Sequence, residues 1–132
     1  MRQLTGHRVN PANDKLEIHV TDERGAGGAS HRYEITGYAG MENPANIGER
    51  APHMERTVIV FQNGPIAESG VNGVTQEALL EICADRLRSF QKGQYQCREN
   101  ALALTKIEEA QLWLHKRTMD RMGRNVEGTH TI

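Results

Sequence analysis

The chain has 132 residues, which suffice for one domain with a modest core and exclude two independent domains around a catalytic cleft. Its 16 basic and 17 acidic residues give a formal net charge of -1, so the basic excess typical of proteins that follow a nucleic-acid backbone is missing. Aromatic residues make up only 5% of the chain, so the core must depend on Leu, Ile, Val and Ala.

Three short β-strands are predicted in the first half of the chain, residues 1–73, which is rich in Gly, Pro and Asn. In the first strand, Leu16, Ile18 and Val20 alternate with polar residues, which is the period of a half-buried strand. The glycine-rich segment Asp22–Ser30 indicates a hairpin loop, and Gly40–Glu55, which has two prolines and no period, is also predicted as a loop. The predicted strands, which we expect to pair antiparallel, are Lys15–Val20, His31–Tyr38 and Thr57–Phe61.

Two helices are predicted in residues 74–124, a stretch without proline. Thr75 can cap the first helix, and Gly93 ends its apolar pattern, which consists of Leu79, Ile82, Cys83, Leu87 and Phe90. The second helix is predicted from Tyr95 to Met122, with an apolar stripe formed by Ala103, Ile107, Ala110 and Leu114. Its length of about 40 Å exceeds what a lone domain of this size needs. We therefore expect burial against other chains, although packing against the protein's own sheet stays open.

Together these elements predict an α+β fold. A small N-terminal antiparallel β-sheet would be followed by a C-terminal helical hairpin with one long helix, and the protein would be oligomeric. We expect residues 1–132 to form a single domain, in which 1–73 are the β-rich part and 74–132 the helical hairpin and C-terminal tail.

The cysteine content and hydropathy indicate a soluble intracellular protein. Cys83 and Cys97 form neither a disulfide framework nor a paired metal motif, which is typical of a reducing cytosol. No apolar run approaches the roughly 20 residues that a membrane span requires. The segment Met1–Val9 is polar where a signal peptide would be apolar. We expect no contact with a membrane.

A cluster of arginines near the end of the second helix is the most informative chemical feature. Arg117, Arg121 and Arg124 are spaced i, i+4, i+7 and so lie along one face. The planar guanidinium presents a fork of donors that suits phosphate. The alternative is that these cations only complement the negative end of the helix dipole.

The break between the two predicted helices is flanked by Phe90 and Asn100. An aromatic ring can stack on a base and an Asn side chain can pair with base or ribose groups, although hairpin packing and helix capping are open alternatives. Asn100 and Arg117 are 17 positions apart on one helix, which is roughly 25 Å along its axis. A ligand of nucleotide size cannot bridge that distance. If both residues serve one pocket, two subunits must share it.

Signatures of catalysis and metal binding are missing from the sequence. It contains no HExxH, GxSxG, GxxxxGK[ST] or CxxC motif, and none of its six histidines pairs with another at metal-ligand spacing on a helix. We expect no catalytic residue, no metal and no cofactor. If the protein were an enzyme, His115 or Glu108 would be the candidate general base.

The second half resembles the helical-hairpin domain of two families of phage counter-defence sponges. The residues that carry the resemblance are Cys97-Arg98-Glu99-Asn100, Leu104–Glu109, Trp113-Leu114, Arg117-Thr118, Arg121 and Val126-Glu127-Gly128-Thr129-His130. One family is the Thoeris anti-defence sponges, which sequester glycocyclic ADP-ribose signals, and the other is the anti-CBASS cyclic-oligonucleotide sponges. Because a β-rich part precedes the hairpin here, the chain is more similar to the Thoeris sponges.

The resemblance implies a function and a set of site residues. It implies a homo-oligomer, at least a dimer and in some members a hexamer, that sequesters glycocyclic ADP-ribose in the cytoplasm of the infected bacterial host without cleaving it. Phe90 would stack on the base of the signal, Asn100 would bond to it, and Arg117 and Arg121 would hold phosphates. It also implies a second site for cyclic trinucleotides or dinucleotides, with candidate or accessory residues Arg98, Arg124, Thr129, His130 and Arg32.

Three other functions stay open on the sequence. One is an enzyme that degrades the same signals, such as a phosphodiesterase or lyase. Another is a structural phage assembly protein, which an oligomeric helix would also suit. The third is a nucleic-acid-binding hairpin, which the net charge of -1 disfavours.

Overall fold

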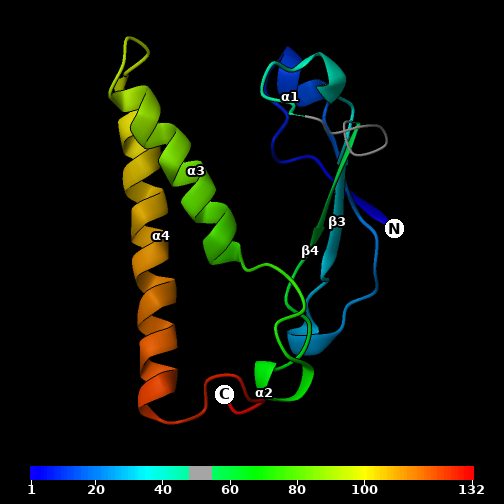
Figure 1. Cartoon of the computed structure of the whole chain (residues 1–132), viewed down its shortest axis with the longest axis vertical. Helices are drawn as coiled ribbons and strands as arrows, with labels where there is room; N and C mark the ends of the chain where they lie inside the picture. The colour runs from blue at the N-terminus through cyan, green and yellow to red at the C-terminus, as the bar shows by residue number, and fades with distance from the viewer. Residues whose placement is uncertain (48–54) are drawn as a thin grey trace. The chain divides into compact units, whose positions relative to one another are not determined.

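A computed structural model describes residues 1–47 and 55–132 (Figure 1). The chain divides into two compact units, Met1–Asn63 and Gly64–Ile132. The first unit holds the β-sheet and the second holds the helical hairpin, so the α+β class predicted from the sequence is confirmed.

The first unit is a four-stranded antiparallel sheet with strand order β1-β2-β3-β4. The strands are β1 (Arg2–Leu4), β2 (Glu17–Val20), β3 (Arg32–Thr36) and β4 (Arg56–Val60). The prediction of three strands was wrong, because β1 is too short to show a period and forms only by pairing with β2, where Arg2 faces Val20. A short helix α1 (Pro11–Lys15) and two 3-10 turns, η1 (Ala26–Gly28) and η2 (Gly40–Glu42), complete the unit. Residues 48–54 of the predicted loop Gly40–Glu55 lie outside the described residues.

A small apolar centre holds the sheet together. Val20 of β2 is 1% exposed and lies opposite Tyr33 of β3. The Tyr33 ring meets the Phe61 ring edge to face, with the ring centroids 5.6 Å apart. The loop between β2 and β3 is fixed by Asp22, whose carboxylate accepts hydrogen bonds from the main-chain N–H groups of His31 and Arg32.

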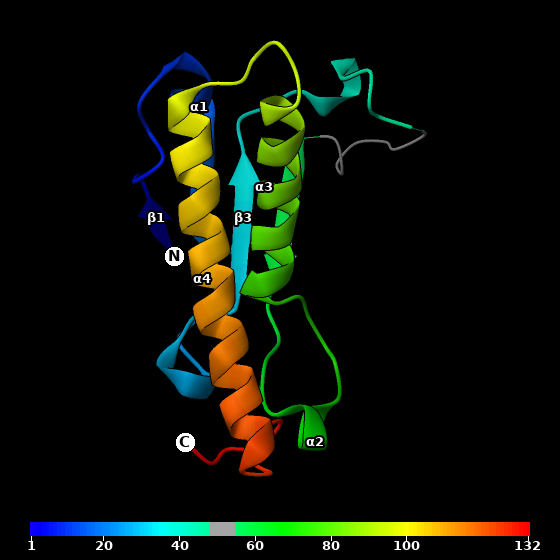
Figure 2. The ribbon, with the colours of Figure 1, turned by 90° about the vertical axis from the view of Figure 1, so that its left-hand side faces the viewer.

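The second unit is an antiparallel helical hairpin (Figure 2). It contains α2 (Ile66–Ser69), α3 (Gln76–Gln91) and α4 (Arg98–Gly123). Thr75 caps α3 as predicted, since its side chain accepts the N–H of Ala78 at 3.1 Å. α4 begins at Arg98 rather than at the predicted Tyr95, because the Cys97 side chain accepts the N–H of Asn100 and so caps the helix there. Among the described residues, no helix combines the length and apolar character that crossing a membrane requires.

The contact between α3 and α4 follows a heptad-like pattern. The less exposed positions of α4 are spaced mainly in steps of four and three residues, and they are Asn100, Leu104, Ile107, Ala110, Gln111, Leu114, Thr118 and Arg121. Ala84 of α3 is fully buried against this seam. Ile82, which we predicted in the apolar stripe of α3, is 61% exposed, and Ala103 of the predicted α4 stripe is also exposed. The other residues of the predicted α4 stripe, Ile107, Ala110 and Leu114, are less exposed, whereas the predicted α3 stripe mixed two faces, since a two-helix seam needs only a narrow band of each helix.

Candidate functional site

The candidate site lies at the end of α4, where the chain turns back as a tail, residues 126–132. The tail contacts α2: the carbonyl oxygen of Gly128 accepts the N–H of Ala67 at 3.1 Å, and His130 Nε2 lies 3.1 Å from Glu68 Oε2. Gly128 has a φ of 80°. A Cβ there would lie 2.7 Å from Cγ1 of Ile66, so only glycine fits this close approach without rearrangement.

Arg121 joins the tail to α4. The residue is 6% exposed, which is rare for an arginine. Its Nε donates to Glu127 Oε2 at 3.1 Å, and its Nη2 donates to the carbonyl oxygens of Val126 at 2.8 Å and Thr129 at 3.2 Å. Its Nη1 donates to the carbonyl oxygen of Thr131. The tail has few apolar residues that could hold it by burial. The hydrogen bonds of the Arg121 guanidinium therefore fix its position instead.

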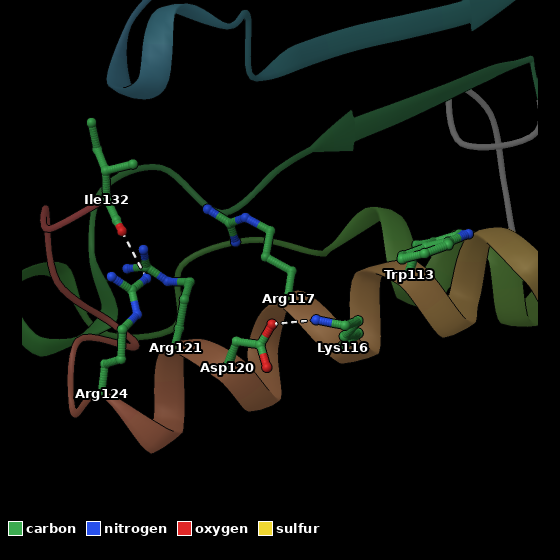
Figure 3. Close-up of a pocket in the computed structure, with 7 residues that line it drawn as sticks. All are labelled: Trp113, Lys116, Arg117, Asp120, Arg121, Arg124 and Ile132. Carbon is green, nitrogen blue, oxygen red and sulfur yellow. Dashed lines mark hydrogen bonds and ion pairs between the residues drawn. The ribbon is translucent and has the colours of Figure 1, made fainter.

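Beside Arg121 lies a cavity of about 300 Å³, shown in Figure 3. Its lining residues are Trp113, Lys116, Arg117, Asp120, Arg121, Arg124 and Ile132. The single acidic side chain among them, Asp120, is paired with Lys116 at 2.7 Å. Arg124 Nη2 donates to the main-chain oxygen of Ile132 at 2.8 Å. The cavity therefore carries a local excess of positive charge, which a chain of net charge -1 does not suggest.

Arg117 differs from the other three cations of this cavity. Its guanidinium extends toward the same side of α4 as those of Arg121 and Arg124 in Figure 3. Within residues 1–47 and 55–132, the Arg117 side chain makes no hydrogen bond or ion pair, and it is exposed. Its donors are thus available to an anion, and a phosphate group matches their geometry.

At the opposite end of the hairpin lie Phe90 and Asn100. Phe90 is 38% exposed, and the guanidinium carbon of Arg86 lies 5.3 Å from the centre of its ring. Asn100 is half-buried in the third position of α4. The structure therefore places an accessible ring and an amide on either side of one helix connection.

One protomer does not bring these two ends together. α4 is continuous from Arg98 to Gly123, so the 17 positions between Asn100 and Arg117 span roughly 25 Å within one helix. Of the predicted ligand-binding residues, Phe90 and Asn100 lie at one end, and Arg117 and Arg121 lie at the other.

The candidate second-site residues are dispersed. Arg98 is the first residue of α4, at the end of that helix far from Arg124. Thr129 Oγ1 donates to the carbonyl oxygen of Val126, and His130 contacts Glu68, so both side chains have partners in the second unit. Arg32 belongs to the first unit, where it contacts Thr21 Oγ1 at 2.6 Å and Glu34 at 3.3 Å.

Several residues of the cavity were not predicted. Trp113 could have been found, because it precedes Arg117 by four positions and so shares its face of the helix, and Lys116 and Asp120 are the immediate neighbours of Arg117 and Arg121 in the sequence. Ile132 could not, because it reaches the cavity only through the return of the tail.

His115 and Glu108, the candidate bases of an enzyme, line a different cavity, a groove of about 760 Å³ between α3 and α4. There Arg88 binds Glu81 and Glu108, each at 3.2 Å, and Gln111 Nε2 donates to Glu81 at 2.8 Å. The Glu108 carboxylate is thus engaged by a guanidinium. Among the described residues, no group of three or more His, Cys, Asp or Glu is placed to hold a metal ion.

Comparison with known proteins identifies the family. A family model described as the Acb2/Tad1 hairpin domain matches residues 54–119, which include α3 and most of α4. The protein "Thoeris anti-defense 1" of Bacillus phage SBSphiJ7 is 42% identical over 125 residues, which cover 92% of this chain and 75% of that protein. Since this relative covers nearly the whole chain and the family model covers the hairpin, the protein belongs to the Thoeris anti-defence sponge family and has an anti-defence function.

Proposed function

We propose that the protein binds glycocyclic ADP-ribose signals in the cytoplasm of the infected bacterial host and sequesters them without cleavage. The observation that carries this proposal is the exposed guanidinium of Arg117, which has no partner among the described residues, beside the cationic cavity at the end of α4 of a chain that belongs to an anti-defence family. A diphosphate linkage is the part of such a signal that arginine recognises best.

The proposed binding pocket for the signal has a base-binding end and a phosphate-binding end. Phe90 stacks on the base and Asn100 bonds to it, while Arg117 and Arg121 form the other end, where the exposed Arg117 is the phosphate ligand. Because these ends are separated by most of α4, one ligand must take them from two antiparallel hairpins of different protomers. Two-fold symmetry then makes two identical pockets per pair.

The exposed apolar side chains of the hairpin support an oligomer, at least a dimer and with a hexamer as the expected assembly. Trp113 is 64% exposed and Leu112, Met119 and Met122 are also exposed on α4 of the isolated chain. Large apolar side chains gathered on one helix are typical of a surface that another chain covers.

A second site would bind cyclic trinucleotides or dinucleotides. Its candidate residues, or residues accessory to the first site, are Arg98, Arg124, Thr129, His130 and Arg32. Arg98 and Arg124 lie at opposite ends of α4, so this site would also need residues from more than one protomer.

Sequestration without chemistry is favoured over degradation by the separation of the reactive groups. His115 and Glu108 line the groove between α3 and α4, whereas Arg117 lines the cationic cavity. Guanidinium stabilises phosphate charge but stays protonated, so Arg117 cannot take the proton that hydrolysis requires.

The test is to incubate the protein with glycocyclic ADP-ribose, remove unbound signal by gel filtration, and denature the complex by heat. Chromatography should then recover intact signal at a fixed ratio to protein, and that signal should still activate its effector. A cleaved product that accumulates beyond one per site and disappears in His115→Ala would establish an enzyme instead. Absence of any retained signal would favour a structural role.

A further inference from the structure

We propose that Arg121 acts on the binding site as a positioning residue that clamps the tail, residues 126–132, rather than as a phosphate ligand. This inference rests on the proposed function, because it concerns how the phosphate-binding end is built. It assigns different roles to Arg117 and Arg121, which lie about one helical turn apart on the same face of α4.

The donors of Arg121 are nearly all committed within the protein. A guanidinium has five N–H groups, and here four acceptors occupy them: Glu127 Oε2 and the carbonyl oxygens of Val126, Thr129 and Thr131. A phosphate that bound this guanidinium through two parallel hydrogen bonds would have to displace tail acceptors, and the displaced carbonyl groups would then need new partners.

The tail is also held by contacts that do not involve Arg121. The N–H of Ala67 binds the carbonyl oxygen of Gly128 at 3.1 Å, and His130 contacts Glu68 at 3.1 Å. Gly128 approaches Ile66 so closely that a Cβ would lie 2.7 Å from its Cγ1. With these anchors the tail is a built part of the second unit, so a ligand does not simply push it aside.

The clamp has a consequence for the cavity. Ile132 at the end of the tail lines the cavity and accepts a hydrogen bond from Arg124 Nη2 at 2.8 Å. The chain of contacts therefore runs from Arg121 through the tail to Ile132 and Arg124. Release of the tail would remove one wall of the cavity and the partner of Arg124, while Arg117 would keep its place on α4.

Two substitutions distinguish a positioning role of Arg121 from a role as phosphate ligand. Both free the tail, but only one of them removes Arg121. Arg121→Lys keeps the charge but cannot reproduce the four contacts, and Gly128→Val frees the tail while every arginine is retained. Lys106→Ala removes an exposed cation elsewhere on α4 and is the matched control. Each variant is analysed by amide hydrogen exchange of residues 126–132 without ligand, and by calorimetric titration with glycocyclic ADP-ribose.

A positioning role predicts faster exchange in the tail and an affinity about tenfold or more lower in Arg121→Lys and in Gly128→Val. The double variant should lose no more affinity than the stronger single variant, since both changes remove the same element. If Arg121 is instead a phosphate ligand, Arg121→Lys also weakens binding because lysine lacks the planar fork, but Gly128→Val leaves the affinity unchanged or raises it by freeing the guanidinium. That pattern would overturn the proposal.

A milder variant covers the case in which Arg121→Lys fails to fold. Glu127→Gln removes only the charge opposite Arg121 Nε and should raise tail exchange with a loss of affinity of a few-fold. Faster exchange with unchanged affinity would contradict the positioning role. If the unchanged protein binds no signal, the proposed function fails and the positioning role fails with it, whereas hydrogen exchange still decides whether Arg121 clamps the tail.

Discussion

The side-chain amide of Gln91 pairs with the main chain of Cys97: Nε2 donates to the carbonyl oxygen and Oε1 accepts from the N–H, both at 3.1 Å. Gln91 is the last residue of α3 and Cys97 caps α4, so this pair closes the connection between the two helices. Phe90 and Asn100 flank the pair along the chain. The base-binding end of the proposed site therefore depends on a side chain that would not itself touch the ligand.

Gln91→Ala should destabilise the hairpin by about 1–2 kcal/mol, because two hydrogen bonds are lost. Signal binding should weaken as well, since the connection no longer restricts Phe90 and Asn100. Chemical denaturation and calorimetry would measure the two effects. Gln96→Ala is the matched control, because the side chain of Gln96 makes no hydrogen bond to any described residue. Equal losses in both variants would show that the pairing is unimportant.

Arg117→Ala and Phe90→Ala should each weaken the binding of glycocyclic ADP-ribose without unfolding the protein. Loss of a charge-assisted hydrogen bond costs about 1.5–3 kcal/mol, roughly ten- to a hundredfold in affinity. Loss of a stacked ring costs about 1–3 kcal/mol per base. Calorimetric titration measures both, with Lys106→Ala as the control for charge on α4. Unchanged affinity in both variants would remove these residues from the site.

A mixture of Phe90→Ala and Arg117→Ala proteins should contain pockets that bind signal with the affinity of the unchanged protein, although each variant alone binds only weakly. If each pocket takes Phe90 from one protomer and Arg117 from the other, a mixed pair contains one intact pocket and one doubly defective pocket. After random subunit exchange, about one quarter of the pockets should be intact. Titration of the mixture measures that fraction. Pockets built within single protomers would give no recovery.

Acid should weaken the α3–α4 hairpin through Glu81. Hydrogen bonds from Gln111 and Arg88 hold the pKa of Glu81 below its ordinary value of 4.5. A carboxyl whose pKa is lower in the folded state stabilises the fold fully above its unfolded pKa and loses that effect as the pH falls through the folded pKa. Glu81→Gln should therefore be less stable near neutral pH and decline less steeply below about pH 5. Urea midpoints measured across this range, with Glu109→Gln for comparison, test this, and parallel curves for all three proteins would refute it.

Gly37→Ala should destabilise the sheet unit. Gly37 has a φ of 97°, and a Cβ there would lie 1.9 Å from the carbonyl oxygen of Lys15. The dihedral strain alone costs about 1–3 kcal/mol, and the clash with main chain adds to it. Gly6→Ala is the control, since a Cβ at Gly6 meets nothing within 4 Å. Thermal unfolding that is equally shifted in both variants would contradict the steric argument.

Local patterns in the sequence determined most of the secondary structure. The alternation of Leu16, Ile18 and Val20 predicted β2, and Thr75 and Gly93 bounded α3, because side-chain periods and caps depend only on near neighbours. The start of α4 was predicted three residues too early, because the cap at Cys97 uses a thiol that is rare in this role. β1 was missed for the opposite reason, since three residues carry no period and gain their conformation from β2.

The difference between Arg117 and Arg121 was decided only by the tertiary structure. In sequence they are the same residue type four positions apart, which is about 40° around a helix, so any local argument treats them alike. The returning tail covers Arg121 with three carbonyl oxygens and Glu127, and leaves Arg117 exposed beside the cavity. Where the tail lies depends on Gly128 meeting Ile66, residues 62 positions apart, and no pattern of near neighbours encodes such a contact.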